Sequence, residues 1–332
     1  MPACAAEAPA PAPAPAPAPK PAPAPKPPEI PEYKLVVGSA WTGSTGHLTS
    51  SIIASLIGKK TNGRIRVSVI PTSGSYDSIN RLRAGEIDIA GTGSYPTLYQ
   101  AANSLAAFEG LPNMKVYPLF PMSVTMFQTV VLADTPIETW EDLVGKKVAS
   151  GTPGSTGVQV FEWFLEVLGI KDKVEVVNLS FGAAADALRD GKIDMGHFLT
   201  AAPNSVVTEL QTRHKIKMLD YNQDMLDGIV KLAYGGQPIF ILTPVTKKIY
   251  PNLIRDAVLG SYWMPWTASE EMPEEAAYWI AKIVWENLDE LKAAHSAFRM
   301  TDAEVYKATA ATEFAPFHPG VLKYYNEQGL LK

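Results

Sequence analysis

Two copies of a Gly-Ser-Thr-Gly loop carry the side chains of this chain best suited to binding a small anion. Positions 43–46 and 154–157 both read Gly-Ser-Thr-Gly, and each loop follows a short apolar run and precedes apolar residues at helical spacing. Free backbone N–H groups and hydroxyls at the start of a helix suit a carboxylate. A single loop of this kind often only caps a helix. The presence of two copies is what indicates a binding site.

A second pair of matching segments supports the repeat. One copy of Leu-Arg-x-Gly-x-Ile-Asp ends at Asp88 and the other at Asp194, each after a second predicted strand, at 64–70 and 173–179. The loop and the closing segment occur in the same order in both copies, and the two pairs are separated by nearly the same number of residues. We therefore predict two β/α lobes of similar design, each with its loop at the carboxyl end of its first strand, where ligands bind in open α/β sheets. Two such lobes would face each other across a polar cleft.

Other strand ends add polar loops. Strand 64–70 is expected to lead into Ser73-Gly74-Ser75, and strand 87–90 into Ser94-Tyr95. Strand 194–198 is followed by Ala202-Pro203, where Pro203 suits the first turn of a helix. A simple turn explains each loop singly, but three successive ones in the first lobe favour a site. His47, directly after the first loop, either contacts an anion or lies on the helix face.

Enzyme and metal signatures are lacking. The chain has no Gly-x-Ser-x-Gly elbow and no Gly-x4-Gly-Lys-Ser/Thr loop, and its five histidines lack metal-ligand spacing. Asp88 and Asp194 resemble a carboxylate pair, yet both follow the same Gly-x-Ile turn, which favours a structural capping role. We expect no catalytic residue, metal or cofactor. The aromatic cluster 262–266 is expected to pack in the core or, alternatively, to reach the cleft.

Composition is that of an ordinary soluble globular protein. The 332 residues are 46% hydrophobic and 19% charged, with a net charge of −5, which argues against a nucleic-acid partner. Residues 1–31 form a Pro/Ala-rich linker, which we expect to be disordered and extended. The single cysteine, Cys4, excludes a disulfide framework. A lone cysteine ahead of a long spacer suggests a lipid tether on an exported protein, and the alternative is a free thiol without a role.

The expected domains are discontinuous. Lobe 1 comprises 32–123 plus 236–332, and lobe 2 comprises 124–235. A long strand within 117–133 is expected to pass from one lobe to the other. A short helix at 137–144 is expected to begin the second lobe, and a helix is expected at 301–312.

Several segments resemble the periplasmic solute-binding subunits of TRAP transporters of the TAXI type. They are TGSTG at 42–46, RLRAGEIDIAGTGS at 81–94, GKKVASGTPGSTG at 145–157, ALRDGKIDMGHFLTAAPNSVVTEL at 187–210, ENLDELKAAHSAF at 286–298 and HPGVLKYYNEQGL at 318–330. The resemblance implies a two-lobed periplasmic binding protein fold, type II-like and α/β, with a hinge. It also implies capture of an organic acid or amino acid and its delivery to a TRAP permease. The chain departs from the family's pattern at His47-Leu48-Thr49 and at Gly93-Ser94-Tyr95.

We expect a monomeric receptor, extracytoplasmic and without nucleic-acid partners, that closes on a carboxylate-bearing solute such as a glutamate-like acid or a dicarboxylate. The alternatives are a sensor module that signals to a membrane partner, and a transferase on the same fold. The predicted ligand-binding residues are Trp41, Thr42, Gly43, Ser44, Thr45, Gly46, His47, Ser73, Gly74, Ser75, Ser94, Tyr95, Pro153, Gly154, Ser155, Thr156, Ala202 and Pro203.

Overall fold

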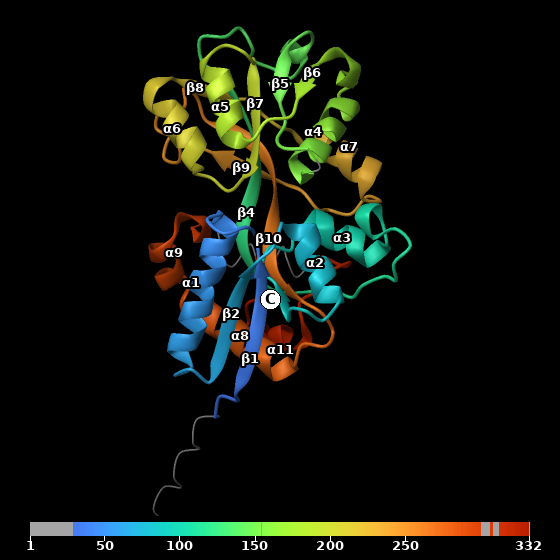
Figure 1. The fold of residues 1–332 in the computed structure, drawn as a ribbon, viewed down its shortest axis with the longest axis vertical. Helices are drawn as coiled ribbons and strands as arrows, with labels where there is room; N and C mark the ends of the chain where they lie inside the picture. Colours follow the sequence, from blue (N-terminus) through green and yellow to red (C-terminus); the bar gives the residue numbers. More distant parts are fainter. Residues whose placement is uncertain (1–28, 154, 300–305, 308–311, 332) are drawn as a thin grey trace, which may run out of the picture.

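A computed structural model describes residues 29–153, 155–299, 306–307 and 312–331. Cys4, Gly154, most of the expected linker and most of the helix expected at 301–312 lie outside this part. The described strands form one mixed sheet in the order β2-β1-β3-β10-β4-β7-β5-β6, with β8 paired to β4 and β9 to β10. Two groups of helices surround the two ends of this sheet and divide the molecule into a lower and an upper lobe (Figure 1).

The first lobe, at the bottom of Figure 1, is built on parallel strands. Strand β1 pairs with β2 on one side and with β3 on the other, and its residues Leu35 and Val37 are buried. The elements of this lobe are β1 (Tyr33–Ser39), α1 (Thr45–Lys60), β2 (Ile65–Pro71), α2 (Ser75–Arg83), β3 (Ile89–Ala90), α3 (Tyr95–Asn103), η1 (Ala106–Phe108), α8 (Glu274–Glu286), α9 (Leu288–Ala294), η4 (Ser296–Phe298) and α11 (Pro319–Glu327).

The second lobe repeats this design at the top of Figure 1. Strand β5 pairs in parallel with β6 and with β7. The elements of this lobe are η2 (Glu141–Leu143), β5 (Lys147–Ala149), α4 (Thr156–Val167), η3 (Lys171–Lys173), β6 (Glu175–Val177), α5 (Phe181–Arg189), β7 (Met195–Thr200), α6 (Ser205–Arg213), β8 (Ile216–Met218), α7 (Gln223–Ala233) and β9 (Ile241–Val245).

Two long antiparallel strands cross from one lobe to the other. They are β4 (Tyr117–Leu132), as expected, and β10 (Ala257–Ala268), which carries the aromatic cluster. Their pairing shifts register between Met264 and Pro265, where Pro265 lies opposite Pro121. Proline has no N–H to donate, which confines it to such irregularities within a sheet. Trp263 and Trp266 are buried, in agreement with a packing role for the cluster.

Strand directions place the two repeated loops on facing ends. Strand β10 is antiparallel to both β3 and β4, so β4 runs in the same sense as β3 and β1. Strand β7 is antiparallel to β4, and β5 is parallel to β7. Strands β1 and β5 therefore run in opposite senses. The chain enters β1 at the end of the first lobe that lies away from the second lobe (Figure 1), so the carboxyl end of β1 points toward the second lobe. Because β5 runs in the opposite sense, its carboxyl end points toward the first lobe.

The two closing segments of the repeat have the same structural role. The Asp88 carboxylate accepts the N–H of Val36 at 2.7 Å, and Asp194 accepts that of Lys147 at 2.9 Å. The backbone N–H of Asp88 donates in turn to the Val36 carbonyl at 2.9 Å, and that of Asp194 donates to the Lys147 carbonyl at 2.7 Å. The predicted structural role of this pair is thus confirmed, and each carboxylate aligns the first strand of its own lobe.

The structure corrects one expected helix and leads us to propose different lobe boundaries. The helix expected at 137–144 is only the short η2, because the Asp142 carboxylate takes the N–H groups of Glu138 and Thr139, each at 2.9 Å, and folds the segment into a turn. We also propose a change to the expected lobe boundary at 236. Residues 241–256 attach to the second lobe, since Leu253 bridges to Ile216 of β8. We therefore propose lobe boundaries within β4 and β10.

Candidate functional site

The repeated loops build the same helix cap in each lobe. The Ser44 hydroxyl accepts the N–H of His47 at 3.2 Å, and the Ser155 hydroxyl accepts that of Val158 at 3.4 Å. The N–H of Ser44 donates to Trp41 at 3.0 Å, and that of Ser155 donates to Thr152 at 3.1 Å. A capping serine uses only a lone pair, and the first N–H groups of a helix have no intrahelical acceptor. Each loop can therefore still donate hydrogen bonds to an anion.

Hydroxyl groups join the three strand ends of the first lobe. Thr72, after β2, donates to the Ser39 carbonyl at the end of β1. The Ser78 hydroxyl lies 2.8 Å from that of Thr72 and 3.2 Å from that of Thr92, after β3. Ser75 donates to the Thr92 carbonyl at 2.6 Å. The loops after β1, β2 and β3 thus form one connected surface on the side that faces the second lobe.

The predicted residues differ in exposure. Exposed residues are Trp41, Thr42, Gly43, Thr45, Ser73, Pro153 and Pro203. Half-buried residues are Ser44, Gly46, His47, Gly74, Ser75, Ser155 and Thr156. Buried residues are Ser94, Tyr95 and Ala202. The Ser94 hydroxyl is already engaged in capping α3, where it accepts the Thr97 N–H at 3.4 Å and lies 2.8 Å from the Thr97 hydroxyl.

A negative charge occupies the loop after β2. The Asp77 carboxylate accepts the Ser73 N–H at 2.9 Å and pairs with Arg81 at 2.9 Å. The Ser73 hydrogen bond, followed by the Arg81 contacts, lowers the pKa of Asp77 below its ordinary value. A charged carboxylate here disfavours an anion at Ser73–Ser75. The loops at Ser44 and Ser155 are consequently the better anion sites.

Gln128 and Tyr250, two residues that no sequence motif marks, position the loop that holds Ala202 and Pro203. Gln128, buried on β4, donates to the Thr200 carbonyl at 2.9 Å and accepts from Tyr250 at 2.5 Å. The Tyr250 hydroxyl accepts the Asn204 N–H at 2.7 Å. This chain of hydrogen bonds ties the loop after β7 to a crossing strand. Helix α6 begins only at Ser205, so Pro203 precedes the helix instead of lying in its first turn.

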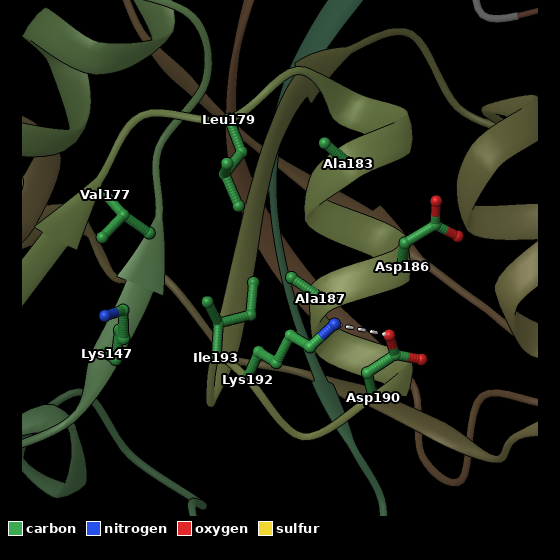
Figure 2. A pocket seen from close by; sticks show the side chains of 9 residues that line it. All are labelled: Lys147, Val177, Leu179, Ala183, Asp186, Ala187, Asp190, Lys192 and Ile193. Carbon is green, nitrogen blue, oxygen red and sulfur yellow. Dashed lines mark hydrogen bonds and ion pairs between the residues drawn. The ribbon is translucent and has the colours of Figure 1, made fainter.

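Two hollows lie elsewhere in the lobes. One, of about 420 Å³, is seen in Figure 2, where Leu179, Ala187 and Ile193 line it beside the Lys192–Asp190 ion pair of 3.0 Å. Lys147 at its edge is the first residue of β5, whereas Ser155 follows the other end of that strand. The second hollow, of about 390 Å³, includes Asp88 and belongs to the matching segment of the first lobe. Neither hollow adjoins the repeated loops.

Within the described ranges, no helix is both long and apolar enough to cross a membrane. The same residues contain no group of three or more His, Cys, Asp or Glu side chains placed to hold a metal ion.

The fold is that of the two-lobed, type II-like periplasmic binding proteins. The pattern of the NMT1-like family matches residues 37–329, and the chain belongs to this family of periplasmic solute-binding proteins. Membership makes it a small-molecule receptor of an extracytoplasmic family, and its homologues are substrate-binding proteins. This confirms the periplasmic solute-binding class that the resemblance implied.

Solved structures of binding proteins are similar in fold. A Streptococcus mutans protein of glutathione import, described with GshT and the cystine ABC importer TcyBC, is 13% identical over 80% of this chain and 95% of that one, with a TM-score of 0.51. A putative L-cystine ABC transporter protein from Listeria monocytogenes is 14% identical over 80% and 96%, with a TM-score of 0.48. A TRAP periplasmic solute-binding protein from Rhodobacter sphaeroides is 14% identical over 90% and 91%, with a TM-score of 0.45.

Proposed function

We propose that this chain captures a small carboxylate-bearing organic acid or amino acid between its lobes and delivers it to a TRAP-type permease, as a TAXI-type receptor. The observation that carries the proposal is the opposed placement of two matching helix caps. Ser44 follows β1 and Ser155 follows β5, and these two strands run in opposite senses. Neither repeated loop contains Lys or Arg. A carboxylate there is met by neutral donors at helix N-termini, which is a well-established mode of anion binding.

Capture proceeds by closure. The carboxylate first meets the Ser44 hydroxyl and the N–H groups of Thr45 and Gly46, and the Ser155 loop then completes the site from the second lobe. A solute that contacts both lobes binds the closed arrangement better and shifts the population toward it. Hydrogen bonds to a charged acceptor contribute about 1.5–3 kcal/mol each.

Removal of the two serine hydroxyls tests the site. After mass spectrometry identifies the acid that co-purifies, calorimetric titration with it should show binding weakened about ten- to a hundred-fold in Ser44→Ala and in Ser155→Ala, to a similar extent. Thr61→Val is the matched control. It removes a hydroxyl that donates to Ile57 at 2.8 Å, but at the far end of α1. We expect it to lower the melting temperature without changing affinity. Unchanged affinity in both serine variants would place the site elsewhere.

Cys4 is proposed as the site of a lipid tether, with the Pro/Ala segment as spacer. Cys4→Ala should then move the full-length protein from the membrane fraction to the soluble fraction of cells. Deletion of residues 5–28 should leave the affinity unchanged, because a polyproline segment forms no internal hydrogen bonds and buries little surface. Equal distribution of parent and Cys4→Ala between the fractions excludes tethering.

A further inference from the structure

A buried phenol at the contact between the lobes has no hydrogen-bond partner among the described residues. Tyr234, directly after α7, has an exposed fraction of 0%, and its hydroxyl bonds to none of the residues that the structure describes. Burying a hydroxyl without a partner destabilises the folded state. Such a group in a native fold therefore calls for an explanation, and a ligand that binds there supplies one.

The position of Tyr234 connects it with helices of both lobes. Its ring centroid lies 5.6 Å from that of Tyr99 on α3 and 5.6 Å from that of Trp163 on α4. Helix α3 belongs to the first lobe, and α4 is the second-lobe helix that Ser155 caps. A Cβ atom built on the next residue, Gly235, would lie 2.5 Å from the Tyr99 hydroxyl. The two lobes thus touch at Tyr99 and Gly235, with the Tyr234 hydroxyl closed off from solvent.

Two more phenols lie near this hydroxyl. Burial, followed by the neighbouring Tyr76 phenol, raises the pKa of both Tyr234 and Tyr262. Tyr76 comes from α2 in the first lobe, and Tyr262 comes from the crossing strand β10. The Tyr76 hydroxyl is occupied, since it donates to Gln100 at 2.7 Å. Tyr234 is left with a free O–H donor in a group of neutral side chains.

On the basis of the proposed function, we propose that the Tyr234 hydroxyl is a specificity-determining ligand contact, which selects acids with a second hydrogen-bond acceptor remote from the bound carboxylate. A dicarboxylate supplies such an acceptor, whereas the alkyl end of a monocarboxylate leaves the phenol unpaired. Sites with a buried polar group discriminate strongly against analogues that lack the matching group. Tyr234 determines which acid is preferred, and the serine caps bind the carboxylate that all these acids share.

Two pairs of acids matched in carbon number test the inference: succinate with butanoate, and glutarate with pentanoate. In calorimetric titration, we expect the better dicarboxylate to bind the parent protein at least tenfold more tightly than its monocarboxylate partner. Tyr234→Phe should lower dicarboxylate affinity about tenfold and leave monocarboxylate affinity unchanged. The melting temperature of the free variant should not fall, because the lost hydroxyl had no partner. A purely structural hydroxyl would instead lower the melting temperature.

Tyr221→Phe is the matched control. Tyr221 is a buried phenol whose ring packs inside the second lobe against Trp140 and Phe164, at 4.9 and 4.8 Å. Its replacement should leave the preference between the paired acids unchanged. The inference is overturned if no dicarboxylate binds better than its partner, or if Tyr234→Phe binds as the parent does while Ser44→Ala weakens binding. If Tyr234→Phe has the expected effect and both serine variants have none, the proposed loop site fails instead.

Discussion

The His47 Nδ1 atom lies 2.7 Å from the Ser39 hydroxyl, so the histidine after the first Gly-Ser-Thr-Gly loop is tied to the end of β1. Ser39 also lies within hydrogen-bonding distance of the Ile70 carbonyl, at 3.1 Å, near the end of β2. The contact braces the start of α1 against two strand ends. Of the two ring nitrogens, only Nε2 can then face a bound solute.

This contact predicts different results for two replacements of His47. Asparagine places a polar atom near the Nδ1 position and can keep the Ser39 contact, whereas glutamine extends to the Nε2 position and loses it. We expect His47→Asn to bind the co-purifying acid within about twofold of the parent and His47→Gln to bind it about tenfold more weakly. Calorimetry measures both. The opposite order would assign His47 to direct ligand contact.

Trp41 should report binding through its fluorescence. Its side chain is 62% exposed beside the Ser44 cap, whereas Trp140, Trp263 and Trp266 are buried. If the second lobe closes over this loop, the indole loses water contact, so the emission should shift to shorter wavelength and quenching by acrylamide should decrease. Trp41→Phe should abolish both changes. Persistence of the shift in Trp41→Phe would trace it to another tryptophan.

The helix caps could be predicted from sequence because they are local. Ser44 and Ser155 lie three residues before the N–H groups that they accept, and the repeat of four letters makes the pattern recognisable. The structural role of Asp88 and Asp194 could be predicted from the repeat, since both close equivalent turns, although each carboxylate bonds a strand 52 or 47 residues away.

The remaining features depend on contacts between segments far apart in the chain. Strand β10 contains Pro265 and no clear alternation, and it is a strand because the distant β4 pairs with it. Gln128 acts through Tyr250, and Tyr234 lies between helices of opposite lobes, so no local pattern marks these residues. The repeat likewise predicts two lobes but not the attachment of 241–256, which the bridge between Ile216 and Leu253 shows.

Acid should destabilise the protein through His197. The imidazole is buried beside Phe161, at a ring separation of 4.9 Å, and burial lowers its pKa from 6.5 to about 3. The folded state keeps this ring neutral, whereas the unfolded chain protonates it below pH 6.5. The free energy of unfolding is therefore unaffected above pH 6.5 and falls between pH 6.5 and 3, by roughly 1 kcal/mol per unit. His197→Phe should flatten the melting temperature between pH 6.5 and 4; an unchanged slope would assign the acid sensitivity to other groups.

The contact between Gly235 and Tyr99 should control closure of the lobes. Gly235 has a φ of +57°, and a Cβ atom there would lie 2.5 Å from the Tyr99 hydroxyl. Gly235→Ala should hold the lobes apart, weaken binding of the co-purifying acid about tenfold and enlarge the radius of gyration in small-angle scattering with that acid present. The cause is steric, because an added Cβ and the Tyr99 oxygen cannot lie 2.5 Å apart, so the lobes cannot keep this contact.

A variant at the neighbouring glycine separates the effect of backbone strain from the effect of this clash. Gly236 has a φ of +84° and no atom within 4 Å of an added Cβ, so Gly236→Ala introduces the left-handed strain alone. It should lower the melting temperature as Gly235→Ala does, yet leave the affinity and the radius of gyration near those of the parent. Tyr99→Phe, added to the Gly235→Ala variant, removes the clashing oxygen and should restore much of the lost affinity. If both alanine variants weaken binding equally and Tyr99→Phe restores nothing, the Tyr99–Gly235 contact does not govern closure.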